Sequence, residues 1–376
     1  RMDASGGYSN GSGCGNEVAT NNTMVRKYVV ESLKHWMKDY HINGFRFDLM
    51  GLHEKETMAK IYSELKEIDP KVMVYGEPWT GGTAAVKDGC TGAVSSSGYG
   101  VGAFDDDFRD AIKGAEFGGF QMGQVQGLSN GKTYYNDSGI VNGLTGKSGK
   151  NNRNTTGKPG LALHYVECHD NYTLYDKLAY SAAVADGNNN IIGSDAIVRQ
   201  FPSSLTDVQL ETIRKQDALA AAYVFLSQGT PFINGGQEFL RTKKGNPDSY
   251  SADMKGGVTW TNTPGNRNID DCNTIDLGFK TTYADVYNTY KGLIALRKAN
   301  PEAFGANTSA KAETVSTGVT KYTAGEFLVY FNATDDAADI ATAGYTKAVD
   351  VSSGEPEEGT TAPTSVPAKG FVILKK

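Results

Sequence analysis

The feature that most constrains the fold is an alternation of short apolar segments with helical segments along the first 300 residues. Residues 45–49 and 72–75 are short apolar runs, and the segment between them has an apolar face at helical spacing. Asp48 and Glu77, which end the two runs, are separated by 29 residues. This is about the length of one strand–helix–strand unit, so the pattern predicts parallel strands in one sheet.

The same alternation continues along the chain. We expect five strands of the series, near Phe47, Val74, Ala103, Tyr165 and Phe232. The longest helices are expected over residues 23–40, 206–227 and 283–299. Glycine is frequent between Gly118 and Gly160, which predicts a long surface loop there.

Beyond residue 305 the helical periodicity disappears, and Thr, Ser, Val, Ala and Gly dominate. Residues 327–331 and 371–374 have the composition of strands. We therefore predict two domains, an α/β domain over residues 1–305 and a small antiparallel β-sandwich over residues 306–376.

Charge and cysteine content exclude several classes of function. Lys and Arg number 37 and Asp and Glu number 43, so the net charge of −6 argues against nucleic acid as a partner. No apolar run has the length of a membrane span. None of the four cysteines forms a C-x-x-C pair, which disfavours a zinc site and favours free thiols over disulfides. A neutral, hydroxyl-rich polymer fits this composition better as a ligand.

Carboxylates or other polar groups end the strands of the parallel series. They are Asp48, Glu77, the run 105–107, the pair His169 and Asp170, and the pair Gln237 and Glu238. In a parallel barrel the carboxyl ends of all strands open on one face, so these groups are expected to converge. Two converging carboxyls are what glycoside hydrolysis requires.

Each of these residues also has a structural interpretation. Asp48 can cap the following helix, Glu77 or Asp170 can belong to an ion pair, and His169 can be a core histidine. Trp79 can be a core aromatic or can stack on a sugar face. Cys168 beside His169 and Asp170 suggests a thiol nucleophile, but on a strand successive side chains point to opposite faces, which disfavours it.

The strand-end strings resemble a known family. Residues 44–51 (GFRFDLMG), 75–79 (YGEPW) and 169–171 (HDN) are similar to three of the four signature regions of the alpha-amylase family of glycoside hydrolases. The string 165–178 (YVECHDNYTLYDKL), the run 237–243 (QEFLRTK) and residues 104–114 and 293–299 resemble the type I pullulanases, which debranch starch-like glucans at α-1,6 bonds. The resemblance covers about residues 5–300.

The resemblance implies roles for particular residues. Asp48 would be the nucleophile of a retaining hydrolase, Glu77 the general acid and base, and Asp170 the stabiliser of the transition state. Arg46 would keep Asp48 ionised, since residues two apart on a strand share a face. Four residues would complete the substrate-binding groups, namely Trp79, His169, Asn171 and Tyr250.

The family's first signature region has no match before Asp48. We therefore expect strands 4 to 8 of a (β/α)8 TIM barrel, with strands 1 to 3 supplied by an upstream segment of the same enzyme as the necessary partner. The alternatives are another amylase-family hydrolase, acting on α-1,4 bonds or cyclodextrins, and a non-catalytic glucan-binding fragment. No cofactor is expected to be required. The oxygen-rich loops leave room for a structural Ca²⁺, although no dedicated ligand loop is present, and a polymer substrate suits a secreted or cell-surface enzyme.

Overall fold

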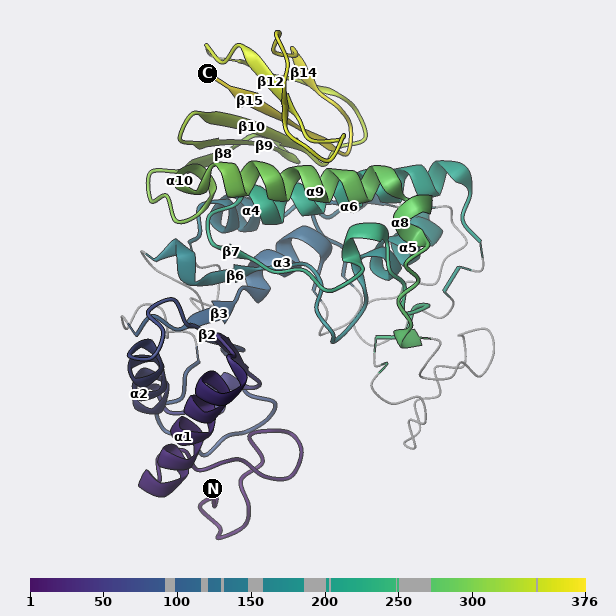
Figure 1. The fold of residues 1–376 in the computed structure, drawn as a ribbon. Helices are drawn as coiled ribbons and strands as arrows, with labels where there is room; N and C mark the ends of the chain where they lie inside the picture. The colour runs from purple at the N-terminus through teal and green to yellow at the C-terminus, as the bar shows by residue number, and fades with distance from the viewer. Residues whose placement is uncertain are drawn as a thin grey trace. The chain divides into compact units, whose positions relative to one another are not determined.

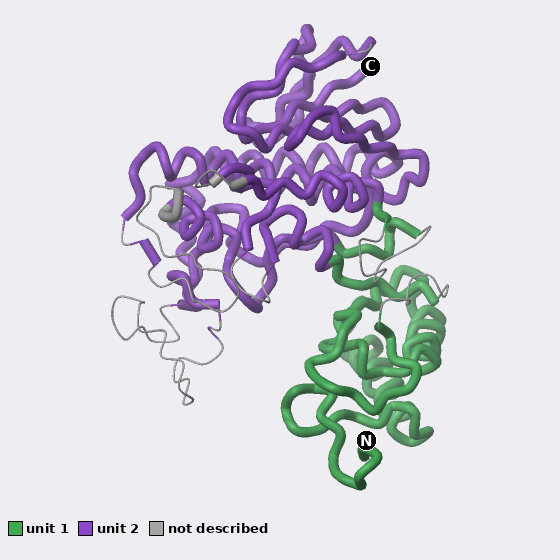
Figure 2. The backbone as a smooth tube through the Cα atoms, turned by 180° about the vertical axis from the view of Figure 1, so that it is seen from behind, with its two compact units in different colours: residues 1–105, 146–163 green, residues 106–145, 164–376 purple. Residues whose placement is uncertain are grey.

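The computed structural model describes residues 1–91, 99–115, 121–129, 132–147, 158–185, 201–202, 204–247, 249, 272–342 and 344–376. They form two compact units (Figure 2), and the chain passes between these units more than once. The first unit comprises residues 1–105 and 146–163, and the second comprises residues 106–145 and 164–376. The predicted domain division at residue 305 coincides with neither boundary and stays a prediction.

The first unit contains the start of the predicted strand–helix series. Its elements are α1 (Thr23–Tyr40), β1 (Gly44–Phe47), the 3-10 helix η1 (Met50–Leu52), α2 (Lys55–Lys66), β2 (Met73–Gly76), β3 (Gly102–Phe104), the 3-10 helix η2 (Pro159–Leu161) and the first residues of β6 (Ala162–His164). The apolar face of α2 is fully buried through Met58, Ile61 and Leu65. It packs with Val74 of β2 in one core, so the 3.6-residue period of the helix and the apolar strand together form this unit.

The five predicted strands of the parallel series are present. They lie in one sheet in the order β1–β2–β3–β6–β7, where β7 is Thr230–Pro231. In the parallel register Phe45 lies opposite Val74, Tyr75 opposite Gly102, and Ala103 opposite Ala162. The carboxyl ends of β1 and β2 therefore lie next to each other, which places the residues that follow them at one edge.

The second unit is mainly helical before residue 305. Its elements there are α3 (Asp106–Lys113), the hairpin β4 (Leu128–Ser129) and β5 (Lys132–Thr133), α4 (Asp137–Leu144), α5 (Leu174–Ala185), α6 (Asp207–Leu226), η3 (Gln237–Phe239), α8 (Phe279–Thr282), α9 (Ala284–Ala299) and α10 (Pro301–Phe304). Helix α6 begins with a capping box, in which the hydroxyl of Thr206 accepts from the Gln209 amide and the Gln209 side chain accepts from the Thr206 amide. Figure 1 shows α9 running alongside α6.

The prediction of a long surface loop, or of several loops, over residues 118–160 is wrong for its middle part. Residues 137–144 form α4, and its side chains Ile140 and Leu144 are buried in the core of the second unit. Glycine in this helix serves close packing, because a Cβ on Gly143 would lie 2.0 Å from the ring of Phe108 on α3. In this part of the segment, glycine therefore indicates a close contact between two helices and not a loop.

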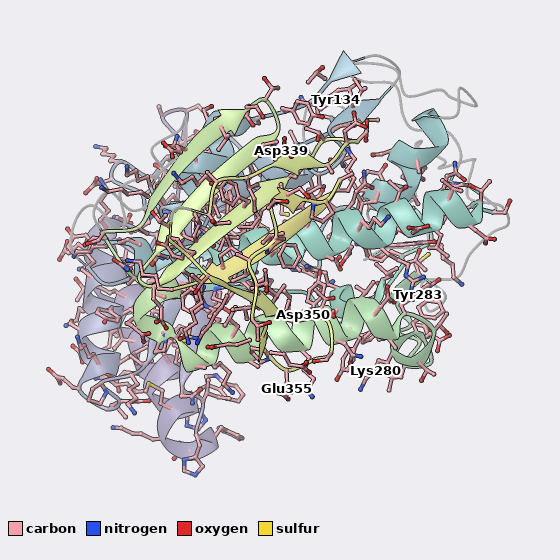
Figure 3. All side chains as sticks on the ribbon, turned by 90° about the horizontal axis from the view of Figure 1, so that it is seen from above. Tyr134, Lys280, Tyr283, Asp339, Asp350 and Glu355 are labelled. Carbon is pink, nitrogen blue, oxygen red and sulfur yellow. The ribbon has the colours of Figure 1, made fainter. Side chains whose placement is uncertain are left out.

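The last part of the chain is an antiparallel sheet, as predicted. Its strands are β8 (Lys311–Ser316), β9 (Val319–Ala324), β10 (Phe327–Asn332), β12 (Lys347–Asp350), β13 (Glu357–Glu358) and β15 (Gly370–Lys375), and a two-stranded ribbon joins β11 (Ala338–Asp339) to β14 (Ser365–Val366). Successive side chains of β10 point to opposite faces of the sheet. Phe331 stacks on Tyr223 of α6, whereas Leu328 packs with Val366 of the ribbon. Figure 3 shows Glu355 near α9, where it pairs with Lys291 at 3.0 Å.

Across the part of the chain that the structure describes, no helix combines the length and apolar character needed to cross a membrane.

The contact between α4 and α3 gives a test of this packing. Replacing Gly with Ala inside a helix usually stabilises it, but Gly143→Ala forces a methyl group into the Phe108 ring. We expect Gly143→Ala to lower the free energy of unfolding by about 1–3 kcal/mol, as overpacked cores do. Urea denaturation of the chain together with its expected upstream segment measures this, with the exposed Ser138→Ala in the same helix as the control. A stabilised Gly143→Ala variant would contradict the close approach.

Candidate active site

One arginine lies between the two carboxylates at the ends of β1 and β2. Arg46 Nη1 is 3.1 Å from Asp48 Oδ1, and Nη2 is 2.7 Å from Glu77 Oε1. Its guanidinium carbon lies 6.0 Å from the centre of the Phe104 ring of β3, at the limit of a cation–π contact. Three adjacent strands thus contribute to one charged cluster. Asp48 lies one residue beyond the end of β1, and the contact shows that its side chain meets that of Arg46.

The turn after β1 aims a backbone donor at Glu77. Leu49 has φ 42° and ψ 49°, a left-handed conformation that is unusual for a side chain branched at Cγ. In this conformation its backbone N–H donates to Glu77 Oε2 at 2.7 Å. Both oxygens of the Glu77 carboxyl are therefore bound, one by Arg46 and the other by the backbone.

Gly51 fixes the segment that follows Glu77. Its N–H lies 3.2 Å from the Glu77 carbonyl and 3.1 Å from the Trp79 carbonyl. A Cβ at position 51 would lie only 2.3 Å from the Trp79 oxygen, so only glycine allows this approach. The backbone on both sides of Glu77 is held by the turn after β1, and the Trp79 side chain remains partly exposed.

The two carboxyls experience different environments. The side chain of Asp48 is 72% exposed, whereas Glu77 is buried. Burial raises the pKa of Glu77 to about 7 and outweighs the opposing effects of the Leu49 amide and Arg46, while the negative Asp48 raises that pKa further. Glu77 does form the strand-end ion pair that the structural interpretation predicts. Even so, with a pKa of about 7 it can carry a proton near neutral pH, as a general acid must.

The structure also rules out a helix-cap role for Asp48. The next helical element, η1, has Leu49 at its N-cap and no side-chain cap, and α2 has Glu54 at its N-cap, so Asp48 caps neither. The Asp48 side chain instead contacts Arg46. Its placement is that of a strand-end group, as the sequence predicts for a functional carboxylate.

The remaining predicted site residues belong to the second unit. His169 and Asp170 are exposed and lie on the segment after β6, with 3.5 Å between His169 Nε2 and Asp170 Oδ1. Asn171 has φ 63°, a conformation that asparagine tolerates, and it turns the chain towards α5. The predicted convergence of Asp170 with Asp48 and Glu77 joins residues of different units and stays a prediction. Tyr250 lies outside the described residues.

The thiol alternative fails for a reason other than the one expected from the sequence. Strand β6 ends at His164, so the alternation of a strand does not apply to Cys168. Burial raises the pKa of the Cys168 thiol, and the thiol donates weakly to the Asp170 carbonyl. A protonated thiol is a poor nucleophile. All four cysteines are free thiols, as expected.

Glu17 was not anticipated from the sequence. Its buried carboxylate accepts from the Ser9 hydroxyl at 2.7 Å and from the Gly11 and Ala85 amides at 3.1 and 3.2 Å. The Gly11 carbonyl in turn accepts from the Gly81 amide. Glu17 thereby fastens the glycine-rich opening loop to the segment after Trp79. An acid directly after such a loop is the only signal the sequence offers.

Within the described residues, no group of three or more His, Cys, Asp or Glu side chains is arranged to hold a metal ion. The candidate site consists of the charged side chains of Arg46, Asp48 and Glu77.

Comparison with known proteins gives consistent relatives. The pullulanase of Bacillus subtilis (strain 168) is 30% identical over 307 residues, which cover 80% of this chain and 36% of that protein. The structure of a pullulanase from Bacillus acidopullulyticus matches with a TM-score of 0.78 and 30% identity, over 100% of this chain and 43% of that one. A mutant pullulanase from Paenibacillus barengoltzii complexed with maltotetraose matches with a TM-score of 0.77 and 30% identity, over 100% of this chain and 54% of that one.

No protein-family model matches the chain. The chain spans about a third to a half of the length of these relatives. It is homologous to pullulanases over most of its own length, and it shares their alpha-amylase-type fold.

The charged cluster predicts how Glu77 titrates. We expect the pKa of Glu77 to be about 7. The variant Asp48→Asn should lower it by removing a negative neighbour, and Arg46→Gln should raise it by removing a positive one. Carboxyl ¹³C chemical shifts measured against pH report this directly, with the exposed Glu56→Gln as the control. A Glu77 that titrates like an ordinary surface glutamate would contradict its burial.

Proposed function

We propose that the enzyme containing this chain is a retaining glycoside hydrolase of the type I pullulanase kind, which cleaves α-1,6-glucosidic branch bonds in pullulan, starch or glycogen-type glucans. The observation that carries this proposal is the pair of carboxyls on Arg46, one exposed and one buried with a pKa of about 7. Their place at adjacent strand ends is where active sites lie in parallel barrels. The homology to pullulanases supports the bond specificity.

In the proposed reaction Asp48 binds and then releases a glycosyl group, and Glu77 gives up and then regains a proton. The Asp48 carboxylate attacks the anomeric carbon while Glu77 gives its proton to the departing glycosidic oxygen. Glu77 then takes a proton from water, whose oxygen displaces Asp48 from the anomeric carbon. Both residues return to their starting states, so the reaction needs no cofactor.

The other groups of the proposed site act on the sugar. Asp170 stabilises the positive charge that develops on the ring, and Arg46 holds the Asp48 carboxylate through their contact at 3.1 Å. Trp79, His169, Asn171 and Tyr250 bind sugar rings and hydroxyls. The maltotetraose bound to the Paenibacillus barengoltzii relative supports an α-glucan as the ligand.

The products distinguish this proposal from its alternatives. Debranching of pullulan releases maltotriose, because only α-1,6 bonds are cut. A hydrolase of α-1,4 bonds releases panose instead, and a non-catalytic glucan-binding protein releases no product. Chromatography of the products from pullulan therefore decides between the three.

The acid role of Glu77 predicts a specific loss. In the active enzyme, Glu77→Gln should fold and bind maltotriose, but kcat on pullulan should fall about 10²–10⁴-fold because the proton donor is lost. In the parent enzyme kcat/KM should fall as pH rises through about 7, where Glu77 loses its proton. Steady-state kinetics across pH measure both effects, with Glu56→Gln as the control. A Glu77→Gln variant with normal kcat would remove Glu77 from the mechanism.

We further propose that β1, β2, β3, β6 and β7 are strands 4 to 8 of a (β/α)8 barrel, closed by an upstream segment that supplies strands 1 to 3. Among the described residues β1 pairs only with β2, so its other edge can accept a strand. Helix α1 exposes Met24 and Tyr28 by 71% and 76%, which is apolar surface for a neighbouring helix to cover.

A polymer substrate leads us to place the enzyme outside the cell or at its surface.

Completion of the barrel is testable by expression. We expect residues 1–376 alone to be insoluble or partly unfolded and inactive on pullulan, because an open sheet exposes its edge and interior. Co-expression with the upstream coding segment, fused or as a separate chain, should restore solubility and activity. The intact mass of the native protein provides an independent check. A soluble, cooperatively melting and fully active 1–376 chain would show that the strand count is wrong.

A further inference from the structure

The segment from Cys168 to Thr173 carries Asp170 and two of the proposed substrate-binding residues, His169 and Asn171. The contact between the His169 and Asp170 side chains does little to fix this segment. The side chains of His169 and Asp170 are 62% and 54% exposed, and at a separation of 3.5 Å between His169 Nε2 and Asp170 Oδ1 their contact is weak. The direction of the Asp170 carboxylate therefore depends on how the backbone of this segment is held.

A buried lysine holds the backbone just before Asp170. Lys243 is only 2% exposed, and its ammonium donates to the His169 carbonyl at 3.0 Å. The same ammonium lies 3.4 Å from the Pro247 carbonyl, so it ties the His169 segment to the chain that follows η3. Burying an ammonium group is costly unless it is paired, which indicates that this contact has a definite structural purpose.

The buried Asp176 fixes Lys243 in turn. Its Oδ2 accepts from the backbone amides of Lys243 and Gly245, at 2.9 and 3.1 Å, and its Oδ1 accepts from the Thr242 hydroxyl. Asp176 lies in the first turn of α5, directly after the His169 segment. The backbone of residues 242–245 is therefore pinned to the start of that helix, and the Lys243 side chain reaches back along the segment.

A second buried lysine holds the backbone after Asp170. The ammonium of Lys113, at the end of α3, donates to the Tyr172 carbonyl at 3.2 Å. Glu167 closes the base of the segment, since its carboxyl accepts from the Leu174 amide at 2.8 Å and from the Asn234 side chain at 2.9 Å. The segment is thus held on both sides of Asp170 and at its two ends.

We propose that Lys243 and Lys113 are positioning residues, which set the backbone of residues 168–173 and so aim Asp170 and His169 at the substrate. This inference rests on the proposed function, because it assigns the lysines to the orientation of a group that acts in that reaction. Both lysines act through backbone carbonyls, so they are not catalytic residues themselves. A displacement of a reacting group by about 1 Å can cost about 10²-fold in rate.

The test compares buried lysines that donate to backbone carbonyls, of which the control Lys369 also pairs with Asp335 at 3.0 Å. In the active enzyme we expect Lys243→Met to lower kcat on pullulan about 10- to 100-fold with little change in KM. Lys113→Met should also lower kcat. Lys243→Arg, which keeps a donor, should recover part of the loss. The control is Lys369→Met, because Lys369 is also buried and donates to the Gln126 and Ala333 carbonyls at 2.9 and 2.7 Å, outside this segment. It should lower the melting temperature but leave kcat unchanged.

A second readout reports on the segment without using activity. Cys168 lies within the segment, and Cys14 is an exposed thiol in the other unit. We expect Lys243→Met to speed alkylation of Cys168 several-fold relative to Cys14, measured peptide by peptide with mass spectrometry, and Lys369→Met to leave the ratio unchanged.

The outcomes separate the two proposals. If a folded Lys243→Met variant keeps the parent kcat and the parent alkylation ratio, or if Lys369→Met lowers kcat equally, the positioning role is wrong. If the parent enzyme does not cleave pullulan, the proposed function fails and the alkylation ratio alone decides the role of the lysines. If Lys243→Met does not fold, Lys113→Met and Lys243→Arg are judged by the same two measurements.

Discussion

The candidate site depends on two opposing effects on the pKa of Glu77. The positive charge of Arg46, which Glu77 shares with Asp48, lowers this pKa, and the burial of Glu77 raises it. Arg46 contacts both Asp48 and Glu77, and a charge pair alone would keep both of them ionised. Burial of Glu77 opposes this and dominates its pKa, while the exposed Asp48 keeps its contact with Arg46. The parallel register of β1 and β2 makes this arrangement possible, because it places Arg46 opposite Tyr75, two residues before Glu77.

Much of this arrangement could be predicted from the sequence. The spacing from Asp48 to Glu77 predicted neighbouring parallel strands, and strand alternation predicted that Arg46 faces Asp48. The contact of Arg46 with Glu77 could not be predicted, because it depends on the register between strands. The left-handed turn at Leu49 was also invisible, since leucine carries no signal for positive φ. Helix α4 was missed because Gly139 and Gly143 resemble loop residues until their neighbours are known.

In the second unit, contacts between residues far apart in the sequence could not be predicted either. The string from Tyr165 to Leu178 identified His169 and Asp170 as a candidate site, but it says nothing about what holds them. Lys243 lies 74 residues beyond His169 in the sequence, and their contact depends on the way Asp176 fastens residues 242–245 to α5. Local periodicity finds elements and strand ends, whereas buried charges that bind backbone carbonyls are determined only by the tertiary fold.

The raised pKa values of two buried glutamates have a thermodynamic consequence for the whole chain. Burial is the main cause of a pKa of about 7 for both Glu77 and Glu167. Between about pH 4.3, where an unfolded glutamate ionises, and pH 7, the folded chain therefore binds more protons at these positions than the unfolded chain. Their contribution to stability is complete below that interval and is lost as the pH rises through it. Folding thus takes up protons from solution at these two positions, and a mildly acidic buffer strengthens their contribution to the folded form.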